Sequence, residues 1–112
     1  MILAIVWKKN QQHIGNISLL NIHWINRSAE FAILIGEKKY WNTGVGKEAG
    51  ALLIQYGFTR LNLHRIYCGT AVLNMGMQKL ALSLGMKQEG RKKHAMFKNG
   101  KYVDVLDYGV MS

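Results

Sequence analysis

A glycine-containing loop that runs into an amphipathic helix is the stretch of this sequence best suited to chemistry. Residues 41–48 read WNTGVGKE, and the apolar pattern of a helix follows directly. Gly44 and Gly46 allow a ligand to approach the backbone and permit positive φ angles. The first N–H groups of a helix have no intrahelical partner and carry the positive end of its dipole. With the charge of Lys47 beside them, these groups predict a site for phosphate or pyrophosphate.

Two common phosphate-binding motifs do not fit this loop. A Walker loop needs Gly-Lys-Ser/Thr after a four-residue spacer, and the sequence contains none. A dinucleotide-binding fingerprint needs a third glycine where Ala49 stands, and residues 63–66 (LHRI) hold no acidic residue for a ribose. On the local signal alone, a flexible connector ending in a helix start remains the alternative interpretation.

Changes in apolar periodicity predict the elements that must position this loop. Three strands form an antiparallel meander, a helix and a strand follow, and a second helix precedes a closing hairpin around Asn99-Gly100. Residues Ala49, Leu52, Leu53 and Tyr56 form the apolar stripe expected to face the core. The order βββ-α-β-α-ββ predicts an α/β domain with a mixed, mostly antiparallel sheet that contains one locally parallel pair. The predicted elements are residues 2–8, 13–24, 29–35, 46–58, 65–72, 77–84, 93–98 and 102–110.

Composition limits the size, compartment and partners of the chain. Its 112 residues fit a single domain, 1–112, and its longest early apolar run is too short to span a bilayer. One cysteine, Cys68, excludes an internal disulfide framework and a cysteine-based zinc site, so we expect a cytoplasmic protein without a metal. The formal charge of +9 attracts anions. The basic residues are scattered without a nucleic-acid-binding motif, which makes nucleic acid an unfavoured partner.

Several ordered blocks of sequence resemble the GNAT superfamily of acyl-CoA-dependent N-acetyltransferases, and among them the branch that acetylates ribosomal-protein amino termini (RimJ/RimL-like). The blocks are in register over residues 14–110, which makes them more specific together than any one alone. They are residues 40–49 (YWNTGVGKEA), 63–66 (LHRI), Asn74, 84–90 (LGMKQEG) and 99–105 (NGKYVDV).

The resemblance implies the acyl-CoA N-acyltransferase fold, acetyl-CoA as cosubstrate and a set of residues that bind it. The loop amides would hold the pyrophosphate, the open edge of the 31–36 strand would hold the pantetheine arm, and Asn74 would contact that arm. An N–H near Ile35 would polarise the thioester carbonyl. The implied cofactor-binding residues are Leu34, Ile35, Gly36, Asn42, Thr43, Gly44, Val45, Gly46, Lys47 and Asn74.

The chain departs from the family pattern at two places that matter. Ala81 stands where many members have a tyrosine that protonates the departing thiolate. The first strand and two helices of the family would lie before residue 1, so the resemblance implies an N-terminally truncated domain. We therefore expect one sheet face to be uncovered and a homodimer to cover it. The apolar residues expected on that face are Ile17, Leu19, Trp24 and Phe31.

Glu30, on the third strand, is the residue we predict to accept a proton, with a surface carboxylate as the alternative. Cys68 fits a buried small residue, and Asp104 is expected to order the closing hairpin. The predicted function is acetyl transfer from acetyl-CoA to a primary amine, by direct attack in a ternary complex. The amine can be a protein amino terminus or a small molecule such as a polyamine. The alternatives are a non-catalytic acyl-CoA-binding module and a ribosome- or RNA-associated module with the same fold.

Overall fold

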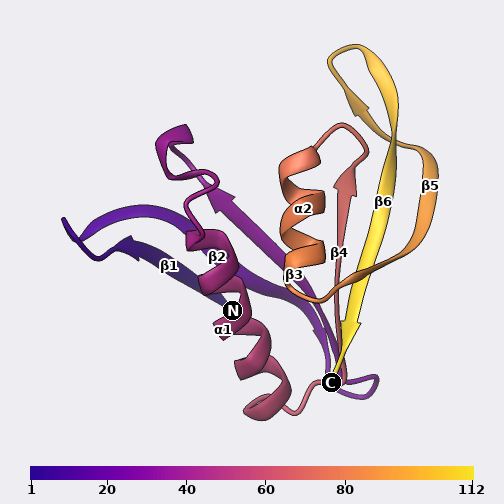
Figure 1. Ribbon diagram of the computed structural model, residues 1–112. Helices are drawn as coiled ribbons and strands as arrows, with labels where there is room; N and C mark the ends of the chain where they lie inside the picture. Colours follow the sequence, from indigo (N-terminus) through magenta and orange to yellow (C-terminus); the bar gives the residue numbers. More distant parts are fainter.

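The computed structural model describes all 112 residues as one six-stranded sheet with two helices (Figure 1). The strand order is β1-β2-β3-β4-β6-β5, and every neighbouring pair is antiparallel except β3–β4. The predicted fold class and order of elements are therefore confirmed. The elements are β1 (Ile2–Trp7), β2 (Gln12–His23), β3 (Ser28–Ile35), the short 3₁₀ helix η1 (Lys38–Tyr40), α1 (Val45–Thr59), β4 (Arg65–Ala71), α2 (Met75–Ser83), β5 (Lys87–Lys98) and β6 (Lys101–Met111).

Both helices pack on one face of the sheet. A Cβ added to Gly50 of α1 would touch Leu84 and Phe31, and one added to Gly57 would touch Ile66 and Leu19. The largest fully buried side chains belong to one hydrophobic core, and their removal from water stabilises the fold. They are Phe31, Leu19, Leu63, Ile66 and Met86. Neither helix has the length and apolar character required to cross a membrane.

The core-facing side of α1 differs from the one predicted. Gly50, Leu53, Ile54 and Gly57 are buried, whereas Leu52 is 63% exposed. The glycines explain the difference, because a side chain at Gly50 would press on Leu84 at 2.9 Å. Small residues let the helix lie close to the sheet, so Gly50 and Gly57 share the core face with Leu53 and Ile54.

The expectation that Ile17, Leu19 and Phe31 lie on an uncovered face is wrong, because all three are buried beneath α1. Strand alternation separates two faces, but it does not say which face the helices cover. Only Trp24 of the four residues is exposed, and it lies in the turn after β2.

The parallel pair β3–β4 is short, and this feature shapes the site. The two strands pair only from Ser28–Arg65 to Glu30–Tyr67, although β3 continues to Ile35 and β4 to Ala71. Beyond Glu30 they diverge, with the ends of β3 and β4 well apart in Figure 1. The backbone of β3 after Glu30 therefore has no strand partner on the side of β4.

The closing hairpin is longer than predicted, since β5 begins at Lys87 rather than at residue 93. Its irregular stretch between Lys92 and Met96 is fixed by Asp104, as predicted. The Asp104 carboxylate accepts the backbone N–H of His94 at 2.9 Å and the Arg91 Nε at 2.6 Å. The His94 N–H, followed by Arg91, lowers the pKa of Asp104.

Candidate active site

A cavity of about 650 Å³ opens where β3 and β4 diverge, between the end of β3, the start of α1 and one side of α2. Its size suits a small organic ligand. Seven of its 14 lining residues are hydrophobic, so the wall is mixed in polarity. The lining consists of Ile33, Leu34, Ile35, Tyr40, Trp41, Asn42, Gly46, Lys47, Asn74, Gly76, Met77, Lys79, Leu80 and Ser83.

The loop before α1 carries a row of unused backbone donors, of which Asn42, Gly46 and Lys47 line the cavity. Asn42 and Gly44 adopt positive φ angles of 59° and 86°, which glycine and asparagine tolerate best. The first helical hydrogen bond runs from the Glu48 N–H to the Gly44 carbonyl, so the N–H groups of residues 45–47 precede it. The N–H groups of residues 42–44 donate to no protein acceptor either. The result is a concentration of donors at the positive end of the helix dipole.

The loop is tied back to the strand that it follows. The Trp41 Nε1–H donates to the Ile35 carbonyl at 3.0 Å, and the Thr43 hydroxyl donates to the Tyr40 carbonyl at 2.6 Å. Tyr40 is buried and packs against Trp7, with ring centroids 4.8 Å apart. These contacts hold the donor row in place relative to the edge of β3.

Backbone groups at the end of β3 alternate between the cavity side and β2. The Gly36 N–H donates to the Ile14 carbonyl, and a Cβ at Gly15 would collide with the Leu34 carbonyl oxygen, so both groups face β2. Ile35 and Ile33 therefore direct their backbone groups toward the divergence. Ile33 was not among the residues predicted from the sequence.

Asn74 has a structural task at the far wall of the cavity. It is the N-cap of α2, and its side-chain oxygen accepts the Met77 N–H at 3.0 Å. The side-chain amide nitrogen makes no hydrogen bond with the protein, which leaves two N–H donors for a ligand.

The charge of the cavity is positive. Lys47 from α1 and Lys79 from α2 both line it, and no Asp or Glu does. Neither lysine has a carboxylate within 4.0 Å. A cavity with two free cations and a row of amide donors favours a polyanionic ligand.

Glu30 lies at the root of the divergence and outside the cavity lining. It is half-buried, opposite Tyr67, and its carboxylate accepts the Asn21 Nδ2–H at 2.8 Å. An Arg65 guanidinium lies 5.3 Å from the Tyr67 ring centre. The carboxylate is positioned by two strands but remains accessible to solvent.

Cys68 and the tyrosines offer no group for chemistry inside the cavity. Burial, followed by the charges of Glu30 and Asp107, raises the pKa of Cys68 to about 11, so its thiol stays protonated. Ala81 is fully buried and does not line the cavity. Tyr40 is the only tyrosine in the lining, and its hydroxyl donates to Gln12 Oε1 at 3.2 Å.

Six of the ten predicted cofactor-binding residues share this cavity: Leu34, Ile35, Asn42, Gly46, Lys47 and Asn74. Gly36 and Gly44 lie outside its lining. Thr43 and Val45 line a different hollow, an apolar groove between β1 and α1. Sequence reasoning missed Gly76, Lys79 and Ser83, whose helical spacing of three and four residues could have identified one wall.

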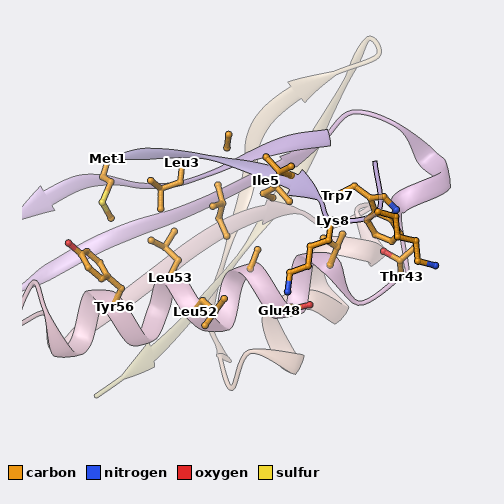
Figure 2. A pocket seen from close by; sticks show the side chains of 16 residues that line it. Met1, Leu3, Ile5, Trp7, Lys8, Thr43, Glu48, Leu52, Leu53 and Tyr56 are labelled. Atoms are coloured by element: carbon orange, nitrogen blue, oxygen red, sulfur yellow. The ribbon is translucent and has the colours of Figure 1, made fainter. Parts of the chain in front are cut away.

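An apolar groove of about 810 Å³ lies between β1 and α1, on the other side of the first turn of α1 (Figure 2). Twelve of its 16 lining residues are hydrophobic. Met1, Leu3 and Trp7 border it from β1, and Leu52 and Tyr56 border it from α1. Lys8, Lys9 and Glu48 are the charged residues in its lining.

Comparisons with known proteins agree with this architecture. A family model described as an acetyltransferase (GNAT) domain matches residues 1–87. The chain is 38% identical over 92 residues to a spermidine N(1)-acetyltransferase of Vibrio cholerae, covering 82% of this chain and 53% of that protein. It is 31% identical over 97 residues to the putative ribosomal N-acetyltransferase YdaF of Bacillus subtilis, covering 87% of this chain and 52% of that protein.

Solved structures show the same relationship. A mutant of the spermidine N-acetyltransferase SpeG from Vibrio cholerae superposes with a TM-score of 0.89 at 32% identity, covering 98% of this chain and 64% of that chain. The spermidine N-acetyltransferase from Vibrio cholerae in complex with CoA and spermine gives a TM-score of 0.84 at 35% identity. The match covers 90% of this chain and 58% of that chain.

The chain spans about half the length of the curated relatives it matches. The matching family model covers well over half of this chain, and the strand divergence, the glycine-containing loop and the helix start lie within residues 1–87. This chain therefore belongs to the GNAT acetyltransferase family.

Proposed function

We propose that residues 1–112 form a single domain that binds acetyl-CoA in the cavity between β3 and β4 and transfers its acetyl group to a primary amine. The observation that carries this proposal is that one cavity brings together Asn42, Gly46 and Lys47 of the donor row, the unpaired Lys79 and the open edge of β3. A nucleotide diphosphate with a peptide-like arm has the matching chemistry, because phosphates accept N–H groups and amides pair with a strand edge. CoA occurs in the complex of a relative.

The residues would divide the work by position. The amides of residues 42–47, with Lys47 and Lys79, would hold the pyrophosphate. The backbone of Ile33 would pair with the pantetheine arm, and the free Asn74 amide would contact it. The thioester supplies an activated acetyl carbon and a thiolate leaving group. The Ile35 N–H would stabilise the negative charge that develops on the carbonyl oxygen.

Glu30 would accept the proton that the attacking ammonium must lose, directly or through a water molecule. The amine nitrogen forms a bond to the acetyl carbon and releases its second proton to solvent, the carbon–sulfur bond breaks, and the thiolate takes a proton from solvent. No tyrosine in the cavity is free to supply that proton. Small polyamines are the amines that we favour as acceptors, because spermidine and spermine occur in the names of relatives.

Calorimetry with acetyl-CoA tests the binding step. We expect saturable one-to-one binding that weakens several-fold in Lys47→Gln, with a smaller dependence on salt. Lys101→Gln at the tip of the β5–β6 hairpin removes the same charge from an exposed site and should leave binding unchanged. Equal loss in both variants, or no binding by the folded wild type, would contradict the proposal.

A free-thiol assay with spermidine and with a peptide amine tests the transfer step. Glu30→Gln should lower kcat by about 10²-fold or more, the usual contribution of a positioned base, without weakening acetyl-CoA binding. Glu37→Gln, an exposed carboxylate paired with Lys39, is the matched control. An unchanged kcat in Glu30→Gln would remove Glu30 from the mechanism.

A non-catalytic acyl-CoA-binding module is the second candidate function. The burial of Ala81 and the engaged Tyr40 hydroxyl favour it, since the cavity holds no free acid for the thiolate. If the chain binds acetyl-CoA but releases no free thiol from it with either spermidine or the peptide amine, this alternative is the correct one.

We also propose a homodimer and a cytoplasmic location. The chain exposes many large apolar side chains, among them Ile2, Leu3 and Val6 of β1, which supports self-association. A relative from Vibrio cholerae forms a dodecamer. The single cysteine is a free thiol, which suits a reducing compartment. Light scattering on the purified chain tests the first point.

A further inference from the structure

The indole of Trp41 occupies the last backbone carbonyl on the open edge of β3. Its Nε1–H donates to the Ile35 carbonyl oxygen at 3.0 Å, and the side chain lines the cavity between β3 and β4. The chain has two other tryptophans, Trp7 and Trp24, and neither donates its indole N–H to a protein acceptor. Trp41 is therefore the one tryptophan whose indole is bonded to the backbone.

The position of the Trp41 indole is fixed from more than one side. The backbone N–H of Trp41 donates to the Lys38 carbonyl at 3.0 Å, and the Lys38 Nζ lies 5.9 Å from the centre of the indole ring. Asn42, the next residue, turns into a positive φ of 59° and begins the donor row of residues 42–47. Trp41 thus links the open edge of β3 directly to the donor row.

The Trp41 bond leaves an uneven set of backbone groups on this edge. Ile33 and Ile35 direct their N–H and C=O groups toward the divergence, where β4 no longer pairs with β3. Because Trp41 takes the Ile35 carbonyl, the Ile33 carbonyl is the one free acceptor where this edge lines the cavity. The N–H groups of Ile33 and Ile35 both remain free. A ligand amide N–H can therefore be accepted at a single place along this part of β3.

An indole suits this task because its nitrogen is a donor only. A glutamine, serine or tyrosine in the same place would cap the carbonyl but would add an oxygen that accepts hydrogen bonds. Such an oxygen would compete with the Ile33 carbonyl for a ligand amide. Trp41 closes one acceptor on the edge without creating another.

A free carbonyl at Ile35 would offer an amide-bearing arm a second position on the strand. Each strand residue rises about 3.4 Å, so positions two residues apart differ by about 7 Å. A shift of that size removes a reacting carbon from attacking distance. We infer that Trp41 is a positioning residue, which closes this second position and so sets the register at which the amide-bearing arm of acetyl-CoA lies on β3. The inference rests on the proposed function and names the group that fixes the cosubstrate within the cavity.

Trp41→Phe tests the inference, because phenylalanine keeps an aromatic ring and removes the donor. With the Ile35 carbonyl free, acetyl-CoA should occupy a productive and an unproductive position. The unproductive position lowers kcat and the KM for acetyl-CoA by the same factor, about twofold if both positions are equally stable, and leaves kcat/KM unchanged. Trp24→Phe makes the same change at an exposed indole in the turn after β2 and should alter neither constant.

A bond that only holds the loop in place predicts the opposite change in KM. Acetyl-CoA binding would then weaken in Trp41→Phe, so its KM would rise and kcat/KM would fall. That result would overturn the inference, and so would unchanged values of kcat and KM in Trp41→Phe.

Nuclear magnetic resonance of the indole N–H groups gives a readout that does not depend on turnover. The Trp41 Nε1–H signal, identified by its loss in Trp41→Phe, should exchange with water more slowly than the Trp24 signal, and it should stay slow at saturating acetyl-CoA. Exchange as fast as that of Trp24 in the complex would overturn the inference, because the Ile35 carbonyl would then be open to the ligand. Slow exchange at Trp41 in a wild type that binds no acetyl-CoA would instead contradict the proposed function.

Discussion

The first turn of α1 separates two hollows that differ in their chemistry. On the side of the β3–β4 divergence, backbone donors, Lys47 and Lys79 meet no carboxylate. On the side of β1, the lining is mostly aliphatic and aromatic, and its charged residues are Lys8, Lys9 and Glu48. The first hollow can select a polyanion, whereas the second can only cover apolar surface.

The difference arises from how the backbone is left unpaired in each place. At β3 the strand loses its neighbour because β4 diverges, and a helix start supplies further N–H groups. At β1 the strand is the last of the sheet, and the nearby side of the helix presents the apolar side chains of Leu52 and Tyr56. Unpaired backbone donors beside positive charge favour a polyanionic ligand, and apolar side chains favour contact with another apolar surface.

Leu53→Ala should have the largest effect, because Leu53 is 3% exposed and packs in the core. We expect a loss of about 2–5 kcal/mol in the free energy of unfolding. Leu52→Ala, one residue away on the groove flank, should change it by less than about 0.5 kcal/mol. Urea unfolding of the wild type and of both variants at the same low protein concentration measures the two losses. Similar losses would contradict the assignment of Leu52 to the groove.

The next largest effect is a loss of folding stability at high pH, which follows from the raised pKa of the Cys68 thiol. The folded pKa is about 11 against an ordinary value of 9.0. A proton held more tightly in the folded state stabilises it below pH 9, and this contribution is lost as the pH rises through 11. We expect a fall of about 2–3 kcal/mol in the wild type relative to Cys68→Ala over that range. Parallel pH curves for the two proteins would contradict the burial of the thiol.

Gly44→Val should disturb the row of backbone donors at residues 42–47. Gly44 has a φ of 86°, and a β-branched residue there costs about 1–2 kcal/mol or shifts the loop. Acetyl-CoA binding should weaken about tenfold, which corresponds to the lower part of that cost. Gly36→Ala is the control, because an added Cβ would meet no atom within 4 Å. Calorimetry that shows equal affinities for Gly44→Val and the wild type would contradict the role of the donor row.

Two substitutions at Asn74 should have the smallest effects, and together they separate its role as a helix cap from its role in binding acetyl-CoA. Asn74→Ala should cost about 1 kcal/mol of stability, because the Met77 N–H loses its acceptor. Asn74→Asp keeps that acceptor and should keep the stability. It places a negative charge in the positive cavity, so acetyl-CoA binding should weaken several-fold. If Asn74→Asp binds acetyl-CoA as tightly as the wild type, the side chain serves only as a cap.

The sequence predicts the order of elements well, because each boundary carries a local signal. Asn99-Gly100 marks the hairpin, and the change of period after residue 36 marks the helix. The packing faces are harder to predict. Gly50 and Gly57 carry no apolar side chain, so a pattern of apolar residues places Leu52 rather than Gly50 toward the sheet.

The candidate site was predictable where it depends on the loop and on family resemblance, as for Asn42, Gly46 and Lys47. The contribution of Lys79 and Ile33 depends on the distance over which β3 and β4 remain paired. That distance is a tertiary property of the packed helices, and no residue of either strand encodes it locally.

Hydrogen exchange measured along the chain with and without acetyl-CoA tests the central claim most directly. We expect slower amide exchange in residues 33–36, 42–47 and 74–77, and no change in residues 2–7 and 52–56. Slower exchange confined to β1 and the groove side of α1, or no change at a saturating ligand concentration, would contradict the assignment of the polar cavity.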